Sequence, residues 1–404
     1  MSGTVAAPRH DFPVLDSLRA VGALAVLTTH TAFWAGSYTA HGVWGTVLAR
    51  LDVGVAIFFV LSGFLLSRGW IAAATEDTPA PAVGRYLWRR LLRILPVYAV
   101  TVVLALGLIR ANSGRGPLDW LGTLLLLDTF TGPRLPDGLT QMWSLAVEAT
   151  FYLALPLLMT IGLGRRRRTG RRPGWRPARL LVLLASLLAT SVAWHLWVAP
   201  ALTDRVPGQP GQWLPAYLTW FAAGIGLALV HDLHTRSAWP RLTAPVVALG
   251  RQPGVCWALA GGLLLLSATP LAGPSMLAPA TAGQGVFKHL VYAGIGTVVV
   301  LTGVFCEDGL FRQVFSSRPL RHLGLTSYSL FCLHLPVLHL VMWLTGWKLF
   351  QGNLAGIFLL TVVASLVAAE IAYRCVERPA MRLRSWRPGR QAATGTASTE
   401  VSAR

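Results

Sequence analysis

The sequence predicts an all-α integral membrane protein with about ten transmembrane helices and both termini in the cytoplasm. Three observations predict this class. Hydrophobic residues make up 54% of the 404 residues and charged residues only 13%, whereas about a quarter of a soluble domain is charged. The mean hydropathy is +0.55. Apolar runs recur that can cross a hydrocarbon core about 30 Å thick. This composition excludes a soluble globular domain, a disordered chain and a small disulfide-stapled domain.

Apolar segments of about 20 residues recur along the chain and define the expected spans. The stretch 118–130 is apolar but short, which predicts a re-entrant or interfacial helix. We expect one membrane domain over residues 14–385, after a cytoplasmic N-terminal segment (1–13) and before a disordered cytoplasmic tail (386–404). The ten expected spans are 14–34, 52–70, 92–110, 141–163, 178–199, 212–230, 254–272, 285–306, 324–345 and 353–374.

The basic residues predict the orientation of these spans. The formal net charge is +19, but the cations lie in clusters between apolar segments, which indicates a membrane protein and no nucleic-acid partner. With the N-terminus inside, 28 of the 35 Lys and Arg fall on the cytoplasmic side, as the positive-inside rule requires. The strong excess of Arg over Lys is typical of a GC-rich bacterial coding sequence. We therefore expect a multi-pass protein of the bacterial cytoplasmic membrane.

The first span carries three ionisable residues, Asp16, Arg19 and His30. Such groups are costly inside a membrane and mark functional sites. Arg19 and His30 are 11 positions apart, so they share a helix face at a separation of roughly 16.5 Å along the axis. The functional interpretation is a fixed cation near the cytoplasm and a titratable imidazole deeper in the span. The alternative is that Arg19 snorkels to lipid headgroups while His30 bonds a neighbouring carbonyl.

The second and third spans contain a small-residue pair and an arginine cluster. The pair Ser62-Gly63 is typical of helix packing, and the glycine spacing does not fit a nucleophile elbow. Arg85, Arg89 and Arg93 are four positions apart on one helical face. Guanidinium groups bind phosphates well, so this face is a candidate anion site, although positive-inside charge accounts for part of it.

Later spans add a carboxylate and a second histidine. Glu148 lies about two turns inside the fourth span and needs a partner. A glutamate that faces an imidazole would orient the ring and stabilise its cation; the alternative is a pair with another buried cation. Tyr328 and His334 lie in the ninth span, where His334 is either functional or a packing histidine. Glu370, four positions before Arg374, predicts a surface ion pair.

Taken in order, these motifs resemble the membrane acyltransferase family 3, the O-acyltransferases of bacterial glycans and antibiotics. The resemblance covers about residues 10–385. Its motifs are the Arg19/His30 pair, the run Phe58 to Leu65, the arginine-rich start of the third span, the run Trp143 to Tyr152, the Tyr328/His334 pair and the ending Glu377-Arg378-Pro379.

The resemblance implies ten spans, an acyl-CoA donor on the cytoplasmic side and transfer to a hydroxyl, with no metal and no tightly bound cofactor. His30 is implied as the catalytic residue, with Glu148 as its expected partner. Acyl-CoA-binding candidates are Arg19, Arg85, Arg89, Arg90 and Arg93. Supporting candidates are Asp16, Ser62, Gly63, Trp143, Ser144, Tyr328 and His334.

Acyl transfer from a thioester to an alcohol needs a base, stabilisation of an oxyanion and exclusion of water. We expect His30 to be the base. Backbone amides near Ser62-Gly63, the Trp143 indole or His334 are candidate oxyanion donors. The expected acceptor is a cell-envelope saccharide or a macrolide-type metabolite, and an envelope-biosynthesis protein is a possible partner.

A glycan transporter or flippase is the alternative function. In it Arg19, His30 and Glu148 would form a proton relay. The expected spans show no inverted repeat and no matching pair of broken helices, which disfavours a transporter.

Overall fold

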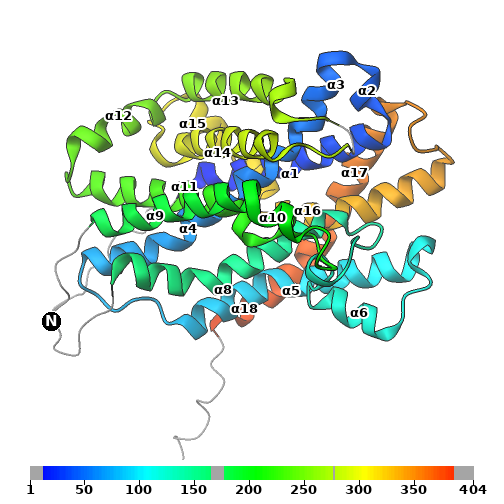
Figure 1. Cartoon of the computed structure of the whole chain (residues 1–404), viewed down its shortest axis with the longest axis horizontal. Helices are drawn as coiled ribbons and strands as arrows, with labels where there is room; N and C mark the ends of the chain where they lie inside the picture. The colour runs from blue at the N-terminus through cyan, green and yellow to red at the C-terminus, as the bar shows by residue number, and fades with distance from the viewer. Residues whose placement is uncertain (1–11, 165–176, 276–277, 386–404) are drawn as a thin grey trace, which may run out of the picture.

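The computed structural model describes residues 12–164, 177–275 and 278–385, and every regular element in these ranges is a helix. Figure 1 shows the long helices side by side in a bundle, with α2 and α3 at one end. The long helices are α1 (Pro13–Trp34), α4 (Gly54–Thr75), α5 (Val83–Leu108), α8 (Trp143–Leu163), α9 (Pro177–Ala193), α11 (Leu214–Thr235), α13 (Pro253–Ser267), α14 (Ala282–Phe305), α16 (Arg318–Thr345) and α17 (Leu354–Ala372).

Short helices connect the long ones. They are α2 (Ser37–Ala40), α3 (Gly42–Ala49), α6 (Pro117–Leu124), α7 (Asp128–Thr131), α10 (Ala199–Leu202), α12 (Pro240–Gly250), α15 (Leu310–Phe315) and α18 (Arg378–Arg382). The helices α6 and α7 occupy the apolar stretch 118–130, and both are too short to cross a membrane. That part of the prediction is therefore confirmed as a non-spanning helical segment.

A long helix covers most of each of the ten predicted spans. Within the described ranges, eight helical stretches are long and apolar enough to cross a membrane. The other two predicted spans correspond to α1, which carries three ionisable groups, and to α13. With 15 residues, α13 extends only about 22 Å, less than the core of about 30 Å. The structure thus shows eight candidate spans, and the count of ten stays a prediction.

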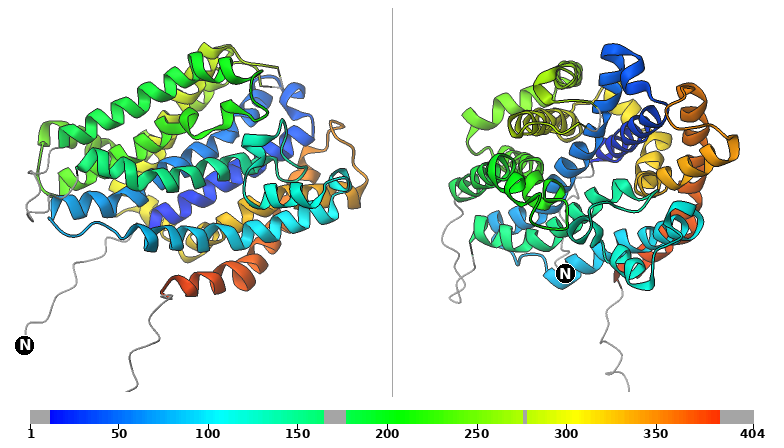
Figure 2. Two further views of the ribbon diagram at one scale, coloured as in Figure 1. Left: turned by 60° about the horizontal axis from the view of Figure 1, so that its bottom comes forward. Right: turned by 45° about the vertical axis from the view of Figure 1, so that its right-hand side comes forward.

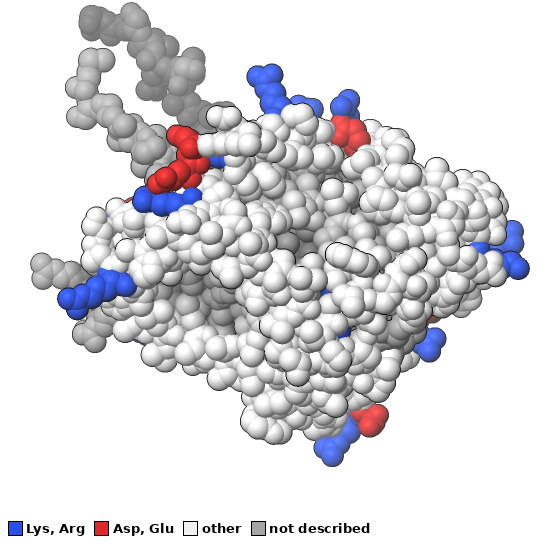
Figure 3. Space-filling model, turned by 90° about the horizontal axis from the view of Figure 1, so that it is seen from above, with Lys and Arg blue, Asp and Glu red and all other residues white. Residues whose placement is uncertain are grey.

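The outer surface agrees with a membrane protein. On the face seen in Figure 3, charged side chains lie mainly near the margins, and most of the area between them is uncharged. Hydrogen bonds between helix ends and loops also join segments predicted on the same side of the membrane. Arg236 donates to Thr75 at 2.7 Å, and the Phe350 amide donates to the Trp34 carbonyl at 2.9 Å.

The cytoplasmic location of the termini stays a prediction. The predicted tail, most of the N-terminal segment and the basic cluster 165–172 lie outside the described residues.

The helix α1 lies inside the bundle, where it contacts α4, α14, α16 and α17 (Figure 2). Beside it, α4 packs closely on α11. A Cβ atom added to Gly63 would lie 2.3 Å from the Phe221 carbonyl oxygen, and one added to Gly224 would lie 2.1 Å from the Val60 carbonyl oxygen. Only glycine permits backbones to approach this closely. Gly63 is therefore a helix-packing residue, as one interpretation of the Ser62-Gly63 pair predicted.

Candidate functional site

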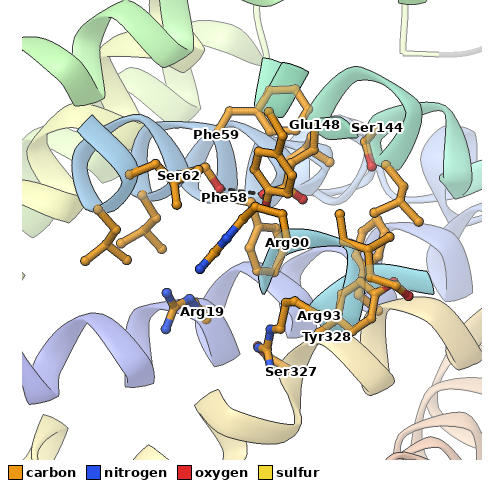
Figure 4. Close-up of a pocket in the computed structure, with 18 residues that line it drawn as sticks. Arg19, Phe58, Phe59, Ser62, Arg90, Arg93, Ser144, Glu148, Ser327 and Tyr328 are labelled. Carbon is orange, nitrogen blue, oxygen red and sulfur yellow. Dashed lines mark hydrogen bonds between the residues drawn. The ribbon is translucent and has the colours of Figure 1, made fainter. Parts of the chain in front are cut away.

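A cavity of about 100 Å³ lies between α1, α4, α5, α8 and α16 (Figure 4). Its walls bring together residues that are more than 300 positions apart in the sequence. The polar residues that line it are Arg19, Ser62, Arg90, Arg93, Ser144, Glu148, Tyr152, Ser327 and Tyr328. Seven of these were predicted site residues; Tyr152 and Ser327 were not.

Three arginines from two helices give the cavity a positive character. Arg19 is held by Asp16 at 2.8 Å, and Arg93 is paired with the buried carboxylate of Glu377. Arg90 has no ion pair within the described ranges, and its Nε is buried without a hydrogen-bond partner. In Figure 4 the ends of the Arg19 and Arg90 side chains face each other, and Arg93 lines the same cavity. Guanidinium groups that line one cavity suit an anion with several oxygens, such as a phosphate.

Glu148 is bound by two hydroxyl groups. Ser62 donates its Oγ hydrogen to Glu148 Oε1 at 2.5 Å, and the Tyr152 hydroxyl donates to the same oxygen at 2.7 Å. The predicted pairing of Glu148 with His30 is therefore wrong, because this face of α8 meets α4 rather than the histidine of α1. Glu148 instead places one negative charge in the wall of a cavity that carries three arginines.

The partner of His30 is the histidine of α16. His30 Nδ1 lies 2.8 Å from His334 Nε2, and the two rings are nearly parallel, with an interplanar angle of 18°. His334 Nδ1 lies 2.7 Å from the carbonyl oxygen of Phe331. A carbonyl only accepts, so in the neutral pair His334 carries its proton on Nδ1 and accepts at Nε2. His30 then donates from Nδ1, which leaves its Nε2 unprotonated.

The exposure of the two histidines differs. His334 is 1% exposed, whereas His30 is only partly buried. The pair therefore consists of an accessible imidazole with a free lone pair and a buried imidazole that fixes its tautomer. This is the arrangement of a general base and the group that orients it.

Other predicted residues lie away from the cavity. Arg85 and Arg89 are exposed on α5 and do not line it. Trp143 packs against Tyr217, with 5.0 Å between ring centres. The predicted pair of Arg374 with Glu370 is confirmed at a partly exposed site.

The predicted oxyanion donors either have partners in the structure or lie outside the arginine cavity. The helix α4 runs unbroken through Ser62 and Gly63, so their amides are used within the helix. Both ring nitrogens of His334 are occupied in the neutral pair. Trp143 is absent from the cavity wall. In the neutral pair, therefore, His334 holds the ring of His30 and has no N–H left for an oxyanion.

Phe331 borders both the arginine cavity and the histidine pair, and Phe58 packs against it. Phe58 and Phe331 line the cavity, and their ring centres are 5.8 Å apart. Phe331 also lies 5.8 Å from the His334 ring. Phe58 was predicted only as part of a family motif and Phe331 was not predicted, because an aromatic residue in an apolar span gives no separate signal. Glu377 was likewise predicted only as part of a motif, although an acidic residue at the end of an apolar span is a usable signal.

The sequence matches a known family and several curated proteins. The family profile described as an acyltransferase domain, that of membrane acyltransferase family 3, matches residues 12–373. The peptidoglycan O-acetyltransferase OatA of Listeria monocytogenes is 25% identical over 94% of this chain, which spans 57% of that protein. The acyltransferase MdmB of Streptomyces mycarofaciens is 28% identical, with 92% of each chain covered.

A third relative is nodulation protein 10 of Rhizobium leguminosarum, which is 26% identical over 92% of this chain and 93% of its own length. No solved structure matches the chain. The family profile spans nearly the whole chain, including the arginine cavity and both histidines. The chain therefore belongs to the membrane acyltransferase family 3 and is an enzyme that transfers acyl groups.

Proposed function

We propose that this enzyme transfers an acyl group, an acetyl group in the simplest case, from acyl-CoA to a hydroxyl of a carbohydrate or macrolide-type acceptor. The family and the names of two relatives support acyl transfer to oxygen: one is named a peptidoglycan O-acetyltransferase and the other an acyltransferase. These names do not identify acyl-CoA as the donor or the class of the acceptor, and both are proposed in addition.

The observation that carries the proposal is the hydrogen-bond chain from Phe331 through His334 to His30. It leaves His30 Nε2 unprotonated and partly accessible, which is the state a general base needs before it meets a hydroxyl. The bond between the rings also stabilises the imidazolium that forms when His30 takes a proton, because a charged donor strengthens it.

The arginine cavity supports a donor that carries phosphates. Arg19, Arg90 and Arg93 supply guanidinium groups for the phosphates of CoA. Arg19 and His30 are on the same helix, separated by roughly 16.5 Å along its axis. The arm of the donor would follow α1 and carry its thioester toward His30. Phe331, with Phe58 packed against it, borders this path, and the two rings would keep water from the thioester.

The transfer balances without a further reactant. His30 Nε2 takes the proton of the acceptor hydroxyl while the oxygen attacks the thioester carbonyl carbon. The tetrahedral intermediate then collapses, the C–S bond breaks and the ester C–O bond remains. His30 returns the proton to the sulfur, so that CoA leaves as the thiol. A route through an acyl-His30 intermediate uses the same nitrogen and gives the same products.

The test measures CoA release by purified protein in lipid nanodiscs supplied with radiolabelled acetyl-CoA. Wild type is compared with His30→Ala and with His41→Ala, an exposed histidine outside the site, each with and without a mixture of glycans and macrolides. We expect release that requires both an acceptor fraction and His30 but not His41. Normal turnover by His30→Ala, or no binding of acetyl-CoA by folded wild type, would overturn the proposal.

A further inference from the structure

An apolar groove of about 790 Å³ lies between α5, α16 and α17, apart from the arginine cavity. Among its lining residues are Leu104 and Leu108 of α5, Leu340 and Trp343 of α16, and Ile371 of α17. All five side chains are exposed, from 38% to 74%. These helices belong to candidate spans, so the groove opens toward the hydrocarbon of the membrane.

The length of the groove corresponds to one leaflet. Its lining on α16 runs from Leu333 to Trp343, a rise of about 15 Å. This is half of a hydrocarbon core about 30 Å thick. The groove therefore has room for an apolar chain that enters from one face of the membrane.

A cation lies at one end of this apolar surface. Arg110 follows the end of α5 and is exposed. Within the part of the chain that the structure describes, its side chain has no ion pair and no hydrogen bond. An unpaired guanidinium at the mouth of a hydrophobic groove suits a phosphate whose attached chain lies in the groove.

A series of contacts leads from this end of the groove to α1, the helix that carries His30. A Cβ atom added to Gly138 would lie 2.4 Å from Ile109 and 3.7 Å from His339. Ile109, which directly precedes Arg110, and His339 therefore lie at the same end of the groove. The His339 ring packs edge-on against Trp34, with 4.6 Å between ring centres. Trp34 is one helical turn beyond His30, a rise of about 6 Å. A sugar attached to a phosphate at Arg110 would therefore extend along these residues toward His30.

We propose that this groove binds the apolar chain of the acceptor, and that the acceptor is a saccharide joined through a phosphate to a long-chain lipid. The phosphate binds Arg110, and the sugar beyond it presents its hydroxyl to His30. The inference rests on the proposed function and names its acceptor class. The charge at the groove end favours this acceptor over a macrolide, because a neutral or basic macrolide gains nothing from a guanidinium group.

The experiment compares two acceptors that share a headgroup. Protein in phosphatidylcholine nanodiscs receives acetyl-CoA and either farnesyl-phosphate-linked glucose or glucose 1-phosphate. We expect wild type to prefer the lipid-linked sugar by at least tenfold in kcat/KM. Arg110→Gln removes the cation, and Val337→Trp fills the groove. We expect each substitution to reduce this preference below threefold. A preference that survives both substitutions would overturn the proposal.

Two control variants carry the same kinds of substitution at positions outside the groove. Arg134→Gln removes an exposed arginine that does not line the groove, and Val182→Trp adds the same bulk to an exposed position of α9. Both should keep the tenfold preference. Because the readout is a ratio, a general loss of folded enzyme does not change it.

A binding measurement separates failure of this inference from failure of the proposed function. Tritiated farnesyl-phosphate-linked glucose is bound to wild type, Val337→Trp and His30→Ala. Binding that Val337→Trp abolishes supports the groove even if neither acceptor is acetylated, a result that would count against the proposed function alone. Equal displacement by phosphatidylglycerol would show a site for bulk lipid, and equal displacement by inorganic phosphate would show a site for the phosphate group alone. Equal binding of farnesol would show that phosphate has no role. Each of these three results would overturn the inference.

Discussion

Replacing His334 by leucine tests whether the buried imidazole fixes the proton of His30. The substitution removes the acceptor that lies 2.8 Å from His30 Nδ1 and leaves a partly buried N–H without a partner. Such a loss costs about 1–3 kcal/mol, and each 1.4 kcal/mol or so on the barrier changes the rate about tenfold. We therefore expect kcat to fall by about 5- to 150-fold. The KM for acetyl-CoA should stay within a factor of two, because His334 does not line the arginine cavity.

The assay is CoA release at saturating acceptor, with binding of acetyl-CoA measured on the same preparation as a check of folding. His334→Gln is the matched variant, since its amide oxygen again supplies an acceptor for His30 Nδ1. It should recover most of the rate that the leucine variant loses. A leucine variant that keeps kcat within twofold of wild type would refute the orienting role of His334.

Three further predictions follow from the cavity and the helix packing. Arg90→Gln should raise the KM for acetyl-CoA at least tenfold. The side chain of Arg89 is exposed outside the cavity, so Arg89→Gln should change this KM less than twofold. Equal effects of the two substitutions would place the donor elsewhere. Gly224→Ala should destabilise the protein by about 1–3 kcal/mol, because the new Cβ would meet the Val60 carbonyl oxygen. The control Gly226→Ala has room for its Cβ. Thermal unfolding in detergent should therefore show a loss of stability for Gly224→Ala and none for Gly226→Ala. Glu377→Leu leaves Arg93 without its buried partner and should cost about 3–5 kcal/mol; an unchanged unfolding temperature would contradict this.

Hydropathy could place the helices along the chain because the length of an apolar run depends on local sequence alone. The contacts between helices could not be predicted in the same way. His30 meets His334 across 304 positions, and no local pattern indicates that α16, rather than α8 with Glu148, lies against that face of α1. The presence of two intramembrane histidines was a usable signal, but their hydrogen bond depends on how two distant helices are packed.

The arginine cluster of α5 illustrates the same difference. Spacing by four predicted a face with Arg85, Arg89 and Arg93, whereas the cavity wall contains Arg90 and Arg93. Both sets fit a helix, since residues three or four apart are neighbours. Packing of α5 against α8 and α16 decides which face turns inward, and a single helix does not contain that information.

The position of α1 has a consequence for how the protein is made. Asp16 and Arg19 lie in the first two turns of α1, where an ionised side chain costs less than at the centre of a span but still disfavours exposure to lipid. In the folded bundle α16 covers part of its surface, yet α16 begins about 300 residues later. The part of α1 that packs on α4 can therefore be covered early, whereas the part that packs on α16 gains its final neighbour only late in synthesis. A chain that stops before α16 also lacks His334, the hydrogen-bond partner of His30.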